Sequence, residues 1–87
     1  MSKSQAYIDQ NQQKFLDELF ELLRIPSIST DSTKKDAIRD AANFLINQLK
    51  GLELNKVELF ETAGNPIVYG EHCPHADQPT VLIYGHY

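Results

Sequence analysis

The sequence has 87 residues, enough for one small domain, and a chain this short buries only about 60% of the surface that its unfolded form exposes. Its net charge of −4 and its scattered basic residues argue against nucleic acid as a partner, because a phosphate-binding face needs clustered Lys and Arg. A single cysteine excludes an internal disulfide. The polar N-terminus and the lack of a long apolar run argue against a signal peptide and a membrane span, so we expect a cytoplasmic protein with no membrane partner.

The first predicted element is a helix over residues 5–24. Apolar residues recur along it at helical spacing: Ile8, Phe15, Leu16, Leu19, Phe20, Leu22 and Leu23. Pro26 requires the helix to end near Ile25, because proline lacks an amide donor and disfavours helical geometry in the residue before it. The stretch PSISTDST that follows is rich in hydroxyl groups and is predicted to be a loop.

A second helix is predicted to start at Ser32 or Thr33. Thr33 and Asp36 have the spacing of a capping box, which satisfies free amides at a helix start. One apolar stripe follows, consisting of Ile38, Ala41, Ala42, Leu45 and Leu49. Gly51 is expected to end the helix in the left-handed conformation, which glycine adopts at little cost.

Three strands are predicted after Gly51. Val57–Glu61 and Ile67–Glu71 are separated by the turn sequence TAGNP and are expected to form an antiparallel pair. The loop HCPHADQP leads to a third strand, TVLIY, over residues 80–84. The order helix, helix, strand, strand, strand predicts an α/β fold.

The third predicted strand is apolar on both faces, since Val81 and Ile83 alternate with Leu82 and Tyr84. Two helices can cover one face of a sheet well, but hardly both. We therefore expect residues 1–87 to be the opening segment of a larger α/β domain whose remainder lies beyond the sequence given.

Two groups of polar residues have a structural interpretation. His72, Cys73 and His75 are zinc ligands by residue type, but structural zinc sites use four ligands, and no second pair lies in the sequence. A polar loop with a half-buried thiol is the favoured interpretation.

The hydroxyl and acidic residues are assigned to loops, caps and a solvated helix face, because they lack the context of a catalytic triad or a carboxylate pair: Asp17, Glu18, Glu21, Ser27, Ser29 and Ser32.

His86 is the candidate functional residue. It follows an apolar strand and Gly85, and functional residues in open α/β sheets gather where strands end. From its position alone, a metal-binding or catalytic role and a hydrogen-bonded loop histidine both remain open.

The ending TVLIYGHY resembles the strand that carries the first metal ligand in the dinuclear-zinc family of carnosinase-type dipeptidases, acetylornithine deacetylase and succinyl-diaminopimelate desuccinylase. In that family an apolar strand ends in Gly-His, with an aspartate two positions after the histidine. The segment LLRIPSIST, which ends the first predicted helix, is similar to the family's opening, and VELFETAGNPIVYGEH is similar to its first strand pair. The resemblance covers the whole chain, and the ending is closest to the dipeptidase branch.

The resemblance implies that residues 1–87 are the N-terminal part of a three-layer α/β/α catalytic domain, with a lid and dimerisation domain elsewhere. It gives His86 a zinc-ligand role, gives Tyr87 packing, and gives no other residue of this chain a catalytic role. The intact enzyme would hold two zinc ions that activate a water towards the amide of a dipeptide, and it would be a homodimer. Residues 1–87 alone are expected to be inactive, because one ligand does not make a zinc site.

Two alternatives remain. A deacylase would share the same chemistry but would act on N-acyl amino acids, and the residues that select the substrate would lie outside this chain. A stand-alone, non-catalytic module would dock its apolar strand onto a partner. Such a module would fold cooperatively by itself, whereas an opening segment would aggregate through its exposed strand.

Overall fold

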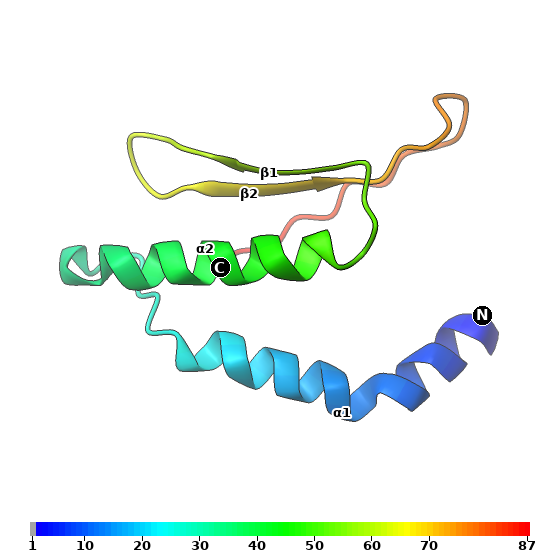
Figure 1. Ribbon diagram of the computed structural model, residues 1–87, viewed down its shortest axis with the longest axis horizontal. Coiled ribbons are helices and arrows are strands. Elements are labelled where there is room, and N and C mark those ends of the chain that lie inside the picture. Colours follow the sequence, from blue (N-terminus) through cyan, green and yellow to red (C-terminus); the bar gives the residue numbers. More distant parts are fainter. Residues whose placement is uncertain (1) are drawn as a thin grey trace.

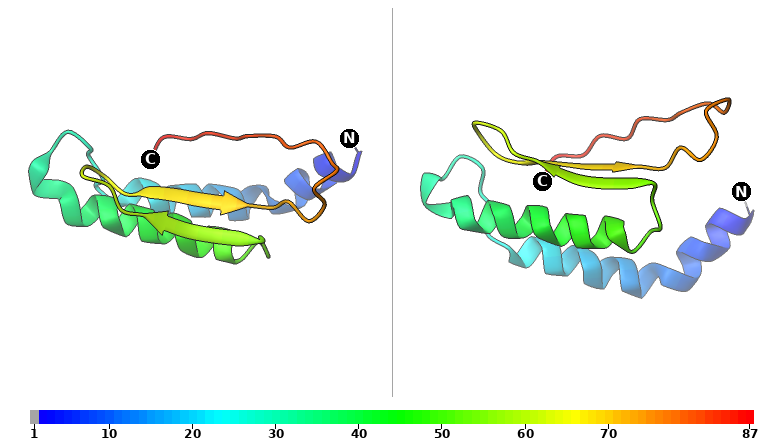
Figure 2. Two further views of the ribbon diagram at one scale, coloured as in Figure 1. Left: turned by 90° about the horizontal axis from the view of Figure 1, so that it is seen from above. Right: turned by 45° about the horizontal axis from the view of Figure 1, so that its top comes forward.

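The computed structural model describes residues 2–87, and in this part of the chain two helices stack beside a β-hairpin (Figure 1). The elements are α1 (Ser2–Arg24), the short 3-10 helix η1 (Ser32–Lys34), α2 (Lys35–Lys50), β1 (Lys56–Phe60) and β2 (Ile67–Glu71). Helix α2 lies between the hairpin and α1, as Figure 1 and the right view of Figure 2 show. Both predicted helices and the first two predicted strands are confirmed, and their mixture is compatible with the predicted α/β class.

The core lies on the face of α2 that packs against the hairpin. Ile38, Ala41, Ala42 and Ile46 are 0–9% exposed there. The two alanines allow the strands to approach the helix closely, because their side chains add little volume. Ile46 is missing from the predicted stripe, which named the half-buried Leu45 and Leu49 instead.

The hairpin pairs β1 with β2 in an antiparallel register that runs from Lys56 opposite Glu71 to Phe60 opposite Ile67. Alternation places half-buried Val57, Leu59 and Val68 on the face towards α2. Gly70 shares this face, and a Cβ on it would lie 3.0 Å from Leu54 Cδ1 and 3.1 Å from Leu49 Cδ1. The leucines therefore fill the space that a side chain at position 70 would occupy.

The predicted capping box at the start of α2 is wrong. The side chain of Asp31 instead caps η1, accepting hydrogen bonds from the Thr33 amide at 2.9 Å and the Thr33 hydroxyl at 2.6 Å. These bonds, with the hydroxyl contributing most, lower the pKa of Asp31. Because the 3-10 turn intervenes, α2 begins only at Lys35, and its N-cap residue Lys34 makes no side-chain capping bond.

The predicted left-handed glycine at the end of α2 is also wrong. Gly51 keeps right-handed helical geometry at φ −73° and ψ −8°, and the amide of Leu52 donates to the carbonyl of Leu49 at 3.0 Å. The left-handed residue is Glu53, with φ 56°. The chain thus turns out of the helix two residues later than predicted, at a residue type that adopts this conformation less readily than glycine.

The third predicted strand does not form within the described residues. Residues 80–87, called the returning stretch below, run back along the hairpin (Figure 2) but have no strand assignment, and Val81 to Tyr84 are 82–89% exposed. A strand requires a ladder of hydrogen bonds to a neighbour, and the described sheet contains β1 and β2 alone. Residues 80–84 therefore have the residue types of a strand, but they form no ladder with β1 or β2.

Helix α1 keeps much of its apolar stripe exposed. Its large apolar side chains are 36–67% exposed, namely Tyr7, Ile8, Phe15, Leu16, Leu19, Phe20 and Leu23. Tyr7 and Phe15 contact each other, with ring centroids 5.8 Å apart. Neither α1 nor α2, as described over residues 2–87, is both long and apolar enough to cross a membrane.

Candidate functional site

His86 lies on an exposed stretch that ends beside the middle of α2 (Figure 1). No heavy atom outside the neighbouring residues lies within 4 Å of where a Cβ on Gly85 would be, so the backbone before His86 is uncrowded. Among residues 2–87, no side chain or backbone group forms a hydrogen bond with the imidazole. The His86 side chain is therefore exposed and without a hydrogen-bond partner in this part of the chain.

Tyr87, directly after His86, is the half-buried residue of this stretch. Its hydroxyl donates a hydrogen bond to the carbonyl of Pro66, which is buried just before β2. Burial raises the pKa of the Tyr87 phenol; the smaller influence of the Arg39 charge lowers this pKa, and that of the Glu61 charge raises it. Packing, the role predicted for Tyr87, agrees with its partial burial, and the hydrogen bond is an additional contact.

Arg39 and Glu61 form a bidentate ion pair beside Tyr87. The Arg39 Nη1 and Nη2 atoms lie 2.7 and 2.8 Å from the two carboxylate oxygens of Glu61. The hydrogen bonds lower the pKa of Glu61 and raise that of Arg39. Because Arg39 belongs to α2 and Glu61 follows β1, the pair ties the helix to the end of the hairpin near Pro66.

The HCPH segment forms part of the loop after β2. Cys73 is exposed, so the predicted half-buried thiol is wrong. Its amide donates to Asn55 Oδ1 at 2.7 Å, which fixes the backbone of the loop rather than the thiol. His72 and His75 are at the far end of the returning stretch from His86, and within residues 2–87 no three His, Cys, Asp or Glu side chains are grouped to hold a metal.

The described residues therefore do not fit a complete metal centre. His86 has the donor chemistry and the accessibility of one ligand, but a catalytic zinc site takes three ligands from protein. An open groove of about 630 Å³ lies between the returning stretch and the helix–hairpin unit, which consists of α2, β1 and β2. Its walls combine apolar side chains, such as Leu49 and Val81, with the polar loop after β2, including His72, Cys73 and His75. Within residues 2–87 these polar side chains are not grouped closely enough to hold a metal ion.

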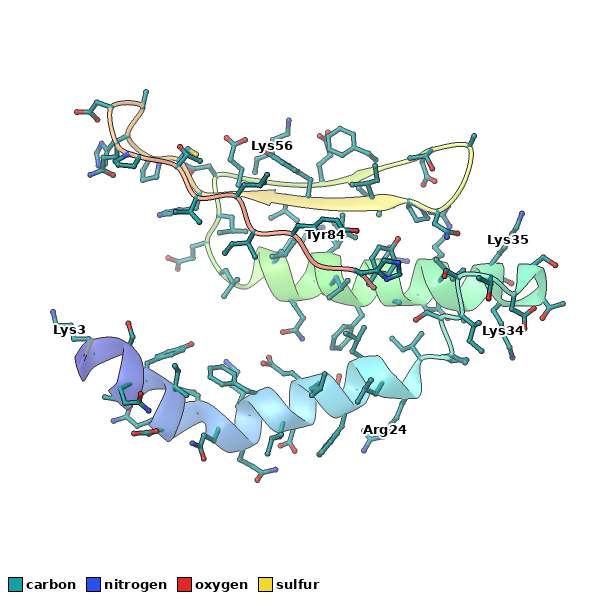
Figure 3. All side chains as sticks on the ribbon, turned by 180° about the vertical axis from the view of Figure 1, so that it is seen from behind. Lys3, Arg24, Lys34, Lys35, Lys56 and Tyr84 are labelled. Atoms are coloured by element: carbon teal, nitrogen blue, oxygen red, sulfur yellow. The ribbon has the colours of Figure 1, made fainter. Side chains whose placement is uncertain are left out.

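The basic side chains are distributed over several elements (Figure 3). Those labelled lie on α1, at the start of α2 and on β1: Lys3, Arg24, Lys34, Lys35 and Lys56. The same view labels Tyr84 on the returning stretch. The absence of a nucleic-acid partner stays a prediction that rests on this scatter.

Comparison with known proteins identifies fungal relatives. The chain is 32% identical over 92 aligned residues to Cys-Gly metallodipeptidase DUG1 of Candida albicans, covering 92% of this chain and 19% of the relative. It is 27% identical over 96 residues to Cys-Gly metallodipeptidase dug1 of Schizosaccharomyces pombe, covering 100% of this chain and 20% of the relative. No family model matches, and no solved structure matches significantly.

These relatives agree with the predicted resemblance at the level of metallodipeptidases. The chain spans about a fifth of the length of the curated relatives it matches. Their names include a metal without specifying which one, and they give no residue of this chain a role. Sequence reasoning singled out His86; the contact between Tyr87 and Pro66 was not anticipated, because nothing in the sequence pattern brings residues 21 positions apart together.

Proposed function

We propose that residues 1–87 are the opening segment of the catalytic domain of a zinc-dependent dipeptidase. The observation that carries this proposal is the similarity to two metallodipeptidases over nearly the whole chain but only a fifth of each relative. The exposed side chains of Val81 to Tyr84 support it. Burying each of them would contribute about 1.5–3 kcal/mol, a gain available if they pair within the sheet of a longer three-layer α/β/α domain.

Within this proposal His86 is one zinc ligand. Its imidazole is exposed, has no hydrogen-bond partner among residues 2–87, and follows an apolar stretch at an uncrowded glycine. The other ligands and the general base would come from residues outside these 87. Residues 1–87 alone are therefore proposed to be inactive.

The proposed substrate is a dipeptide of the Cys-Gly class, by analogy with the substrate in the relatives' names. A deacylase acting on N-acyl amino acids is the alternative within the same chemistry. The names of both relatives favour the dipeptidase.

The test uses the protein expressed from its complete open reading frame, with metal content and hydrolysis of Cys-Gly and of an N-acetyl amino acid as readouts. His86→Ala is compared with His75→Ala, since both remove an exposed imidazole. We expect His86→Ala to lose most bound zinc and to lower kcat/KM for Cys-Gly by about 100-fold or more. His75→Ala should stay within about twofold of the parent protein.

Two results would change the conclusion. Preferential hydrolysis of the N-acetyl amino acid would replace the dipeptidase with the deacylase. A reading frame that stops after Tyr87, together with cooperative folding of residues 1–87 as a monomer, would favour the non-catalytic module. Equal zinc content in the two histidine variants would remove His86 from the metal site.

A further inference from the structure

The returning stretch contacts the helix–hairpin unit through its last residue, Tyr87. Val81 to Tyr84 are 82–89% exposed, and Gly85 and His86 are exposed as well. Tyr87 alone in residues 80–87 is half-buried, and its hydroxyl donates to the Pro66 carbonyl. Over the described chain, this is the hydrogen bond that joins residues 80–87 to the helix–hairpin unit.

Three elements build the point of attachment. Pro66 is buried immediately before β2, so its carbonyl is held by the hairpin. Arg39 on α2 and Glu61 after β1 form their bidentate pair beside the phenol, close enough to influence its ionisation. The acceptor of the Tyr87 hydroxyl is therefore part of the best-packed region of the chain and provides a fixed reference for the residue next to His86.

We propose that Tyr87 is a positioning residue that holds the backbone of Gly85 and His86 against the β1–β2 hairpin and so fixes the direction of the His86 imidazole. Gly85 permits many backbone conformations, and the apolar residues before it make no ladder within the described sheet. A contact one residue after His86 restricts those conformations before any ligand binds, which reduces the ordering cost of binding. The effect of this lower ordering cost on metal affinity rests on the ligand role proposed for His86.

The matched pair of variants is Tyr87→Phe and Tyr7→Phe. Each removes one phenolic hydroxyl, but Tyr7 lies on α1, outside the returning stretch, is 55% exposed, and its hydroxyl makes no hydrogen bond with the described residues. Both are made in the protein expressed from its complete open reading frame. Amide hydrogen exchange of the peptide covering residues 80–87 is measured after metal removal, and the zinc dissociation constant is measured by competition with a chelator.

We expect Tyr87→Phe to speed exchange in this peptide several-fold and to weaken zinc binding by about tenfold, the lower end for loss of a residue that orients a ligand. KM for Cys-Gly should change less than twofold, because the hydroxyl acts on His86 and not on the substrate. Tyr7→Phe should match the parent protein in all three measurements.

The two readouts separate this inference from the proposed function. Faster exchange in Tyr87→Phe would support the attachment through Tyr87. If the His86→Ala variant nevertheless keeps its zinc, the ligand role of His86 would be wrong. Exchange equal to that of Tyr7→Phe would overturn the positioning role. Unchanged zinc affinity would also overturn it, if His86→Ala does lose zinc.

Discussion

The helix–hairpin unit, made of α2, β1 and β2, and the returning stretch, residues 80–87, have similarly apolar residues in opposite surroundings. Ile38 in the unit is 4% exposed, whereas Ile83 in the stretch is 88% exposed. The unit buries its isoleucine because a hairpin with matching alternation lies against α2. The stretch has no such neighbour in the described chain. Hydrophobic pattern thus selects which residues can be buried, and the availability of a partner surface decides which are.

The apolar side chains of helix α1 are intermediate in exposure between these two regions. Its apolar residues recur at helical spacing, as those of α2 do, yet its large apolar side chains other than Leu22 are 36–67% exposed. Figure 1 shows the reason, since α1 lies on the side of α2 away from the hairpin and no other described element lies on its far side. The exposed fraction of apolar side chains thus rises from α2 through α1 to the returning stretch. This rise follows the loss of neighbouring surfaces and not the number of apolar residues.

The largest expected effect compares two identical substitutions in a polypeptide of residues 1–87, kept dilute to limit the aggregation expected of its exposed strand. Ile38→Ala should lower the free energy of unfolding by about 2–4 kcal/mol, because it leaves a cavity in the core. Ile83→Ala should change it by less than about 0.5 kcal/mol, because the side chain is already in solvent. Urea unfolding followed by circular dichroism measures both.

The same pair sharpens the comparison in the protein from the complete reading frame. If residues 80–84 pair within a larger sheet, Ile83→Ala should become as costly as Ile38→Ala, about 2 kcal/mol or more. A neutral Ile83→Ala in both polypeptides would mean that the stretch stays in solvent, against the proposal that these residues belong to a larger catalytic domain.

A smaller effect is expected from Gly70→Ala within the unit. The new Cβ would lie 3.0 Å from Leu54 Cδ1 and 3.1 Å from Leu49 Cδ1, so both leucines must shift. Overpacking should outweigh the gain in backbone entropy and lower the free energy of unfolding by about 1 kcal/mol. Gly64→Ala is the control, because its Cβ meets only Thr62 Oγ1 at 3.8 Å. Equal unfolding midpoints for the two variants would contradict this account.

The parts of the fold that follow from local pattern were predictable. The stripe on α2 and the alternation of β1 and β2 depend on side-chain periods of 3.6 and 2, which the sequence displays directly. Pro26 correctly indicated the end of α1, which closes at Arg24. Each of these features depends on residues that are neighbours in the chain.

The errors concern features that depend on geometry or on distant residues. Asp31 rather than Thr33 provides the cap, because a 3-10 turn precedes the helix. The third strand lacks a partner in the described chain, and residue pattern carries no information on whether one is present. His86 could be selected from its place after an apolar run, but the contact between Tyr87 and Pro66 depends on tertiary packing.

The smallest expected effect tests the ion pair that fastens the unit beside Tyr87. Hydrogen bonds from Arg39 lower the pKa of Glu61 in the folded chain, so the pair stabilises fully above the ordinary glutamate pKa of about 4.3. That contribution is lost as pH falls through the lowered pKa. Glu61→Gln should therefore reduce the urea midpoint slightly at pH 7 and not at all at the acid end, since an exposed pair contributes little.

Arg39→Gln provides the control for this last experiment. In that background Glu61→Gln should have no pH-dependent effect on the urea midpoint, because the partner that lowers the carboxylate pKa is gone. A pH dependence that survives the loss of Arg39 would assign the stabilisation to another group. Its disappearance would establish that the link between α2 and the end of β1, next to the Pro66 carbonyl, is electrostatic and specific to this pair.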